Sequence, residues 1–307
     1  MKIKKPTFWD KKEKTFFSLL LYPFSILVNL INFFKGRSKK IKKKIKTICV
    51  GNIYIGGTGK TPLVIKINDL LQKENKTVFI KKKYHDQLDE QRLLSLNGKL
   101  ICEKSRIEAL DKAQKEGFEI AILDDGLQDK KIYYDLTIVC FNTELGVGNQ
   151  MIIPAGPLRE NIKNLKNYKA VLLNGVKKNQ DLINLIRKNN EEIKIFEGKY
   201  IATNLEKIDK QKKYLAFSGI GNSENFDEIL ESYNFNVLEK IHYPDHYNFS
   251  KQEIEKIKKI ASQQNLSIMT TEKDYMRLNE NQKKNIYFLK IKLVINNEEK
   301  FIDFLNS

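Results

Sequence analysis

The sequence has few of the side chains that build disulfide frameworks or zinc sites. Its 307 residues include only three cysteines and three histidines. The cysteines are odd in number, widely spaced and embedded in apolar runs, which is typical of reduced core thiols in a cytosolic protein. Neither set has the spacing of zinc ligands, so the sequence argues against a zinc site. These residues are Cys49, Cys102, Cys140, His85, His242 and His246.

Acidic residues are scarce at the N-terminal end. Residues 1–46 hold 14 Lys and Arg side chains but only two acids, Asp10 and Glu13. Of the net charge of +17, +12 therefore lies in this segment and only +5 in the other 261 residues. A basic nucleic-acid-binding protein would spread this charge over its body and interleave it with aromatic side chains, and this chain does neither. The charge points instead to an anionic membrane surface as partner, and not to nucleic acid.

One long apolar run lies between these basic clusters, over residues 16–34. Its polar positions are spaced 4, 3, 4 and 3 residues apart, so a helix would gather them into one narrow stripe. The run is just long enough to span a bilayer, but Pro23 and the stripe favour a helix that lies in the interface or packs against the body. An ordinary buried core helix is the alternative. The polar positions are Ser18, Tyr22, Ser25, Asn29 and Asn32.

A signal peptide does not fit this segment, because no small-residue cleavage site follows the apolar run. The flanking lysines would bind acidic headgroups at about 1 kcal/mol each. We therefore predict a membrane-associating segment over residues 1–45, peripheral or monotopic.

The most informative stretch covers residues 47–61, where a strand-like apolar segment leads through a glycine turn to a helical pattern. The glycines let backbone N–H groups close around phosphate oxygens, Lys60 reaches the terminal phosphates, and the Thr61 hydroxyl can ligate magnesium. Tyr54 stands where the strict pattern has glycine, so the match is to a Gly-Gly-x-Gly-Lys-Thr variant. The alternative is a glycine-rich turn with a chance Lys-Thr pair. The predicted nucleotide-binding residues are Gly56, Gly57, Thr58, Gly59, Lys60 and Thr61.

Strands and helices alternate after residue 45, which predicts a P-loop NTPase-like α/β fold with a doubly wound, mainly parallel sheet. A second such series begins near residue 214, after a looser lysine-rich stretch. We therefore predict a nucleotide-binding domain over 46–198, a linker over 199–211 and a smaller C-terminal α/β domain over 212–307. Strands are expected at 46–52, 77–80, 119–124, 135–141 and 169–173, and helices at 61–73, 104–116 and 179–189.

Two further features could complete a nucleotide site. Asp124 and Asp125 end an apolar strand, which is where a nucleotide-binding sheet places the acid that binds magnesium or orders water. An acidic turn is the alternative, and Gln128 in the following loop is a plausible polar contact. The segment 142–168 is too long and too rich in Gly and Pro for a simple connection, so it is expected to line a site. Within it, Arg159 could clamp a phosphate, although a solvated arginine is as reasonable.

The C-terminal region offers weaker signals. His246 follows an expected strand, but a lone histidine is more often structural than catalytic. Thr271 and Asp274 have capping-box spacing, which predicts the start of a helix rather than a ligand contact.

Taken together, the motifs resemble those of the tetraacyldisaccharide 4′-kinases of lipid A synthesis, in the family's order. The resemblance implies transfer of the γ-phosphoryl group of ATP, with Mg2+, to the 4′-hydroxyl of an acylated glucosamine disaccharide 1-phosphate. The resemblance further implies that this lipid A precursor is phosphorylated at the cytoplasmic face of the bacterial inner membrane, and the enzyme is expected to be a monomer. The motifs are Gly51-Asn52, Gly56–Pro62, Asp124–Gln128, Gly148-Asn149, Pro154–Glu160, Phe217–Gly221, Asp245-His246 and Thr270–Asp274.

The resemblance also implies individual roles. Asp89 matches the general base, which acts with His246, while Lys60 and Asp125 are counted with the catalytic groups. Magnesium is expected on Thr61, Asp124, Glu90 and Gln128, and substrate contacts on Tyr84, Arg106, Asn149 and Arg159. The alternative function is a P-loop ATPase or GTPase that acts as an assembly or metallochaperone switch, which would hydrolyse nucleotide without a phosphorylated acceptor.

Overall fold

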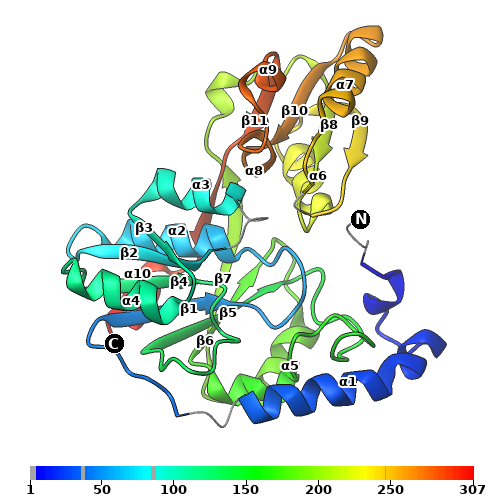
Figure 1. Cartoon of the computed structure of the whole chain (residues 1–307). Helices are drawn as coiled ribbons and strands as arrows, with labels where there is room; N and C mark the ends of the chain where they lie inside the picture. The colour runs from blue at the N-terminus through cyan, green and yellow to red at the C-terminus, as the bar shows by residue number, and fades with distance from the viewer. Residues whose placement is uncertain (1–4, 36–38, 84–87, 246) are drawn as a thin grey trace. The chain divides into compact units, whose positions relative to one another are not determined.

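The computed structural model describes residues 5–35, 39–83, 88–245 and 247–307 (Figure 1). The described chain forms two compact units. The larger unit comprises residues up to 83, residues 97–199 and residues 294–307, and the smaller comprises residues 88–96 and 200–293. The units differ from the predicted boundaries, because residues 88–96 group with the C-terminal region and residues 294–307 with the nucleotide-binding region.

An eight-stranded sheet frames the larger unit, in the order β12-β7-β6-β5-β1-β4-β2-β3, and the pairings from β7 to β3 are all parallel. Every residue of β4, β5 and β6 is buried, which explains why these strands are apolar runs without alternation. The predicted doubly wound parallel sheet is confirmed. The strands are β1 (Lys46–Gly51), β2 (Thr77–Lys82), β3 (Leu100–Glu103), β4 (Ile120–Asp124), β5 (Leu136–Asn142), β6 (Ala170–Asn174), β7 (Lys194–Ala202) and β12 (Ile291–Ile295).

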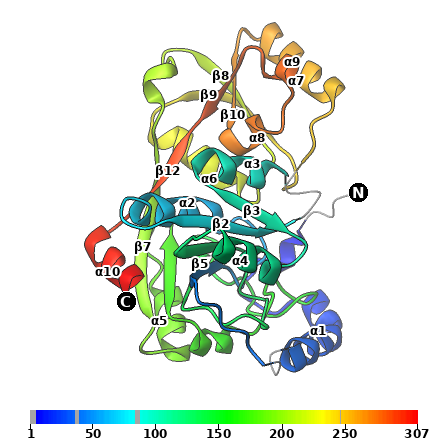
Figure 2. The same ribbon diagram turned by 60° about the vertical axis from the view of Figure 1, so that its left-hand side comes forward.

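Polar caps set where the helices of this unit begin. Ser105 and Asn179 each accept a hydrogen bond from the first turn of the helix that follows. The last helix packs Phe301 against Phe196 of β7, with ring centroids 4.8 Å apart, which ties residues 294–307 to this sheet (Figure 2). The helices are α2 (Lys60–Leu71), α4 (Arg106–Lys115), η2 (Ile162–Asn167), α5 (Gln180–Asn189) and α10 (Glu298–Asn306).

The N-terminal apolar run forms a helix, α1 (Phe16–Lys35), after a short turn, η1 (Thr7–Trp9). Within the described ranges, none of the helices combines the length and the apolar character needed to cross a membrane. Most large apolar side chains of α1 are exposed, whereas Ser18 and Ser25 are buried. Three of the five residues of the predicted polar stripe, Ser18, Ser25 and Asn32, therefore face the protein, whereas Tyr22 and Asn29 are exposed.

The smaller unit holds a four-stranded sheet in the order β11-β10-β8-β9, again with parallel pairings. The predicted helix cap is confirmed, since the Asp274 amide donates to the Thr271 hydroxyl at 3.0 Å. The elements are α3 (Leu88–Asn97), η3 (Leu205–Lys207), β8 (Lys213–Ser218), α6 (Ser223–Ser232), β9 (Asn236–His242), α7 (Lys251–Gln263), β10 (Ser267–Thr271), α8 (Glu272–Tyr275), α9 (Glu280–Lys283) and β11 (Ile286–Leu289).

Candidate active site

The glycine loop connects β1 to the N-terminus of α2, as a phosphate-binding loop requires. Gly59 adopts φ 90°, a left-handed conformation that suits glycine, and contributes no side-chain cap to α2, which begins at Lys60. The first N–H groups of the helix are therefore available to an anion. Asn52 holds the loop from within, because its amide nitrogen donates to the Gly56 carbonyl at 3.2 Å and to the Thr58 hydroxyl at 3.0 Å.

Asp124 lies beside this helix start, at the end of β4. Its register opposite Val50 of β1 places it next to the loop, and the Thr61 hydroxyl lies 3.5 Å from Asp124 Oδ2. The same oxygen accepts from the Lys81 ammonium at 2.6 Å, in an ion pair whose two side chains are 2% and 1% exposed. Asp124 Oδ1 is buried and has no hydrogen-bond partner among the described residues.

Three cationic side chains lie close to Asp125, beside the glycine loop. Asp125 has φ 57°, and its carboxylate lies 2.9 Å from the Arg159 guanidinium and 3.8 Å from the Lys60 ammonium. Burial acts to raise the pKa of Asp125, but Lys60 and Arg159 outweigh it and hold the pKa below its usual range. Arg106, the first residue of α4, donates to the Asp125 carbonyl at 2.6 Å. Three cations thus converge where a polyphosphate would need them.

Two predicted polar residues hold loops in place. Gln128 donates to the Asn52 carbonyl at 2.9 Å, which ties the loop after β4 to the glycine loop. Asn149 is 3% exposed, and its amide donates to the Ala155 carbonyl and accepts from the Met151 amide. The side chain of Asn149 is therefore turned into its own loop.

Asp89 and Glu90 belong to the smaller unit, in the first turn of α3. The Asp89 carboxylate is buried and lies 2.7 Å from the Arg277 guanidinium and 3.6 Å from the Lys273 ammonium. Lys273 also pairs with Glu90 at 3.0 Å and with Asp245 at 3.7 Å. Burial acts to lower the pKa of Lys273, but Glu90, Asp245 and Asp89 outweigh it and raise the pKa above its usual range.

Arg277 extends this cluster to Asp274, at 2.5 Å, which in turn accepts from the Gly219 amide at 2.8 Å. Burial raises the pKa of Asp274 despite these partners. The ion pairs made by α3 explain why residues 88–96 group with the C-terminal region. Tyr84 and His246 lie outside the described residues.

Sequence reasoning missed Lys81, Lys273 and Arg277. A lysine at the end of a strand is usually solvated, and only the register of β2 against β4, which aligns Ile80 with Leu123, brings Lys81 next to Asp124. The partners of Asp89 are separated from it by more than 180 positions. No local pattern could have paired them.

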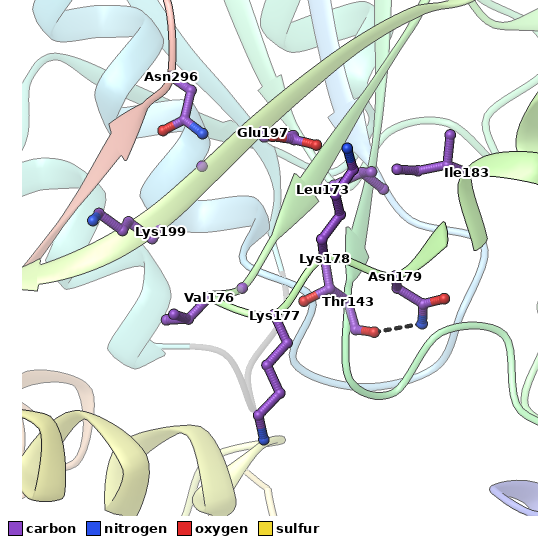
Figure 3. Close-up of a pocket in the computed structure, with 12 residues that line it drawn as sticks. Thr143, Leu173, Val176, Lys177, Lys178, Asn179, Ile183, Glu197, Lys199 and Asn296 are labelled. Carbon is purple, nitrogen blue, oxygen red and sulfur yellow. Dashed lines mark hydrogen bonds between the residues drawn. The ribbon is translucent and has the colours of Figure 1, made fainter. Parts of the chain in front are cut away.

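A cavity of about 190 Å³ opens at the carboxyl ends of β5, β6 and β7 (Figure 3). Figure 3 shows Thr143 and Asn179 side by side at its wall, where the Asn179 amide donates to the Thr143 carbonyl at 2.7 Å. The Thr143 hydroxyl is buried and without a partner among the described residues. In open α/β sheets ligands bind at this edge, where the glycine loop also lies.

The residues present fit a magnesium ion that arrives with a nucleotide. The Thr61 hydroxyl and the Asp124 carboxylate offer oxygen ligands, which magnesium prefers. Asp124 Oδ1 is buried and has no hydrogen-bond partner among the described residues, so it could bind the ion. Across the described ranges there is no cluster of three or more His, Cys, Asp or Glu side chains that could hold a metal by itself. Magnesium is commonly bound by one or two protein groups together with substrate phosphates, so such a cluster is not required.

Comparison with known proteins covers nearly the whole chain. A family model described as tetraacyldisaccharide-1-P 4′-kinase matches residues 17–307. The tetraacyldisaccharide 4′-kinase of Pelagibacter ubique (strain HTCC1062) is 51% identical over 303 residues, which cover 97% of this chain and 96% of that protein. The corresponding protein of Rickettsia typhi (strain ATCC VR-144 / Wilmington) is 32% identical over 326 residues, with 97% of each chain covered.

A solved structure shares the fold. The crystal structure of LpxK from Aquifex aeolicus in complex with ATP superposes with a TM-score of 0.69 at 24% identity, and the match covers 94% of this chain and 98% of that chain.

Proposed function

The chain belongs to the tetraacyldisaccharide-1-phosphate 4′-kinase family, and we propose that it transfers the γ-phosphoryl group of ATP to the 4′-hydroxyl of a tetraacylated glucosamine disaccharide 1-phosphate. The observation that carries the proposal is the glycine loop, with Lys60 and Thr61 at the start of α2 and Asp124 alongside. In the reaction the 4′-oxygen bonds to the γ-phosphorus, the bond to the bridging oxygen of ADP breaks, and the hydroxyl proton passes to a base.

The larger unit binds the nucleotide. Backbone N–H groups of residues 56–59 and the first turn of α2 surround the phosphates, and the Lys60 ammonium meets the terminal phosphates. Arg159, from the loop that follows β5, and Arg106, at the start of α4, add positive charge beside Asp125. Because these groups are held by ion pairs and hydrogen bonds in advance, they stabilise charge on the transferred group at little reorganisation cost.

Magnesium would be held by the Thr61 hydroxyl and Asp124, with Gln128 as a further oxygen donor named by the family resemblance. The resemblance also names Glu90, which belongs to the smaller unit and pairs there with Lys273 at 3.0 Å. When bound, the ion neutralises negative charge on the phosphoryl oxygens. Lys81 holds the Asp124 carboxylate in place, since its ammonium lies 2.6 Å from Oδ2, while Oδ1 has no hydrogen-bond donor among the described residues.

Asp89 accepts the proton of the attacking hydroxyl, in the role that carboxylates take in kinases generally. Arg277 and Lys273 fix its orientation from α8 and the turn that follows it. His246 acts with Asp89, and Tyr84 contacts substrate, by the family resemblance alone. The expected substrate contact of Asn149 is not proposed, because its side chain is buried and bonded within its own loop.

The acceptor is a lipid, so the enzyme must work at a membrane surface, at the cytoplasmic face of the inner membrane. Helix α1 supports this placement because its solvent-facing side exposes large apolar side chains, with exposed fractions from 45% to 75%. Placing the active site beside the acceptor converts a search in solution into a local encounter.

The test incubates γ-labelled ATP and magnesium with the purified chain and the lipid A precursor in mixed micelles. We expect label in the lipid for the parent and its loss in Lys60→Ala and Asp89→Ala. Free phosphate without labelled lipid would instead support an ATPase. Lipid phosphorylation that survives Asp89→Ala would move the base to another residue.

A further inference from the structure

Three polar residues of α1 face the protein, and we call them the docking face of this helix. Ser18 and Ser25 are 0% and 3% exposed and Asn32 is half-buried, whereas Tyr22 and Asn29 are exposed. The three inward residues are spaced by seven, which places them on one side of the helix. The buried side of the helix thus carries polar side chains, with Val28 packed against the core beside them, whereas most of its large apolar side chains face the surroundings.

This docking face holds one loop, residues 152–159. The Ser25 hydroxyl donates to the Ile152 carbonyl at 2.7 Å and accepts from the Ala155 amide at 3.1 Å. The Asn32 amide donates to the Arg159 carbonyl at 3.0 Å, and the Trp9 indole donates to the Pro154 carbonyl at 3.0 Å. Four contacts from the N-terminal segment therefore fix the backbone of this loop.

The 152–159 loop also contacts the glycine loop. The Arg159 amide donates to the Ile53 carbonyl at 2.7 Å, and the Ile55 amide donates to the Pro157 carbonyl at 2.8 Å. The Arg159 guanidinium continues to Asp125 at 2.9 Å. The 152–159 loop therefore contacts both α1 and the predicted phosphate site.

The residues before α1 also reach the glycine loop directly. The Tyr54 hydroxyl donates to Asp10 at 2.6 Å and accepts from the Lys5 ammonium at 2.8 Å. The Trp9 carbonyl accepts from the Asn149 amide at 2.9 Å and lies so close to Gly148 that a Cβ there would be 2.2 Å from it. This packing leaves little room for the N-terminal segment to shift without moving the loops.

We propose that Ser25 and Asn32 are positioning residues of the nucleotide site, through which α1 sets the backbone of residues 53–55 and the place of Arg159. One helix then faces the membrane with its apolar side and shapes the phosphate site with its polar side. The inference rests on the proposed function, because it takes the glycine loop to be the ATP site. It predicts that disturbing the docking face weakens ATP binding even where membrane binding is intact.

The test compares four variants of the full chain. Ser25→Val removes both hydrogen bonds and adds one methyl group, and Ser25→Thr adds the same methyl group but keeps a hydroxyl. Asn32→Leu removes the bond to Arg159. Asn29→Leu is the matched control, because it makes the same change of polarity on the exposed side of the same helix. Each variant is measured for MgATP affinity without lipid, for KM and kcat with the lipid A precursor, for co-sedimentation with anionic vesicles and for the thermal midpoint.

We expect Ser25→Val and Asn32→Leu to bind MgATP about fivefold to tenfold more weakly and to raise the KM for ATP, because buried backbone groups of the loop lose their partners. Vesicle binding should stay within about twofold of the parent, since the apolar side is unchanged. Ser25→Thr should retain most of the affinity and Asn29→Leu all of it.

Unchanged MgATP affinity in both Ser25→Val and Asn32→Leu would overturn the inference, as would an equal loss in Asn29→Leu. If Ser25→Val does not fold, Asn32→Leu decides, because its side chain is only half-buried. A parent chain that does not bind MgATP would defeat the proposed function itself, and that outcome is distinct from the others.

Discussion

At the scale of single residues, the sequence identified candidate site residues from their position in a local motif. Lys60 and Thr61 follow a glycine turn, and Asp124 ends an apolar strand, so each could be predicted before the fold was known. The burial of Lys81 could not be predicted, because lysine side chains are usually exposed. Its burial is stabilised by the ion pair with Asp124, which the sequence does not show. Ion pairs between residues of different strands cannot be predicted until the register of the strands is known.

The buried Lys81–Asp124 pair gives a prediction at this scale. Lys81→Met should destabilise the protein by about 3–5 kcal/mol, because it leaves a carboxylate in the core without its cation. Urea unfolding followed by circular dichroism would measure the loss. The control is Lys112→Met, which breaks an ion pair with Glu103 at 3.0 Å whose side chains are 54% and 32% exposed, and which should have a much smaller effect. Equal unfolding midpoints for the two variants would contradict the role given to Lys81.

At the scale of elements, α1 was predicted as a helix with the correct extent, but its orientation came only from the structure. The spacing of polar residues defined a stripe and not the direction in which it points. The helices and strands whose periodicity was clear, such as β5 and α5, also matched their expected ranges. Helix α3 was not predicted, since its mixed sequence has no clear apolar face.

The orientation of α1 predicts which side chains hold the protein on a membrane. Leu27 is 58% exposed on the outer face of the helix, so Leu27→Asp should weaken binding to lipid vesicles by about tenfold through lost burial of apolar surface. Co-sedimentation with vesicles measures this. Leu96→Asp is the control, because Leu96 is 67% exposed on α3 of the other unit. A similar loss in both variants would mean that the change reflects general charge and not the face of α1.

At the scale of the whole molecule, the fold class followed from alternating strands and helices, but the compact units did not follow from the order of the chain. Residues 294–307 return to the first sheet through the packing of α10 on β7, and residues 88–96 join the second unit through the ion pairs of α3. Such returns depend on contacts between distant segments. A prediction that divides the sequence into consecutive domains cannot identify these contacts.

The uneven distribution of charge is also a property of the whole molecule, and it predicts how membrane binding depends on salt. Lys39 and Lys40 are exposed in the N-terminal basic segment, where +12 of the net +17 lies. The double variant Lys39→Gln/Lys40→Gln should bind anionic vesicles less tightly by about 2 kcal/mol at low salt, at about 1 kcal/mol for each lysine. The difference from the parent should shrink as salt rises, because the Debye length falls from about 30 Å at 0.01 M to about 8 Å at 0.15 M.

The matched control for this experiment carries the same change of net charge on α7, as Lys256→Gln/Lys259→Gln, where both lysines are exposed. If attraction depended on total charge alone, the two double variants would lose the same affinity at every salt concentration. We expect the α7 variant to bind as the parent does, because its lysines belong to a region whose charge is nearly balanced. Vesicles of neutral lipid should bind the parent and both variants equally, through the apolar side of α1, which salt does not screen.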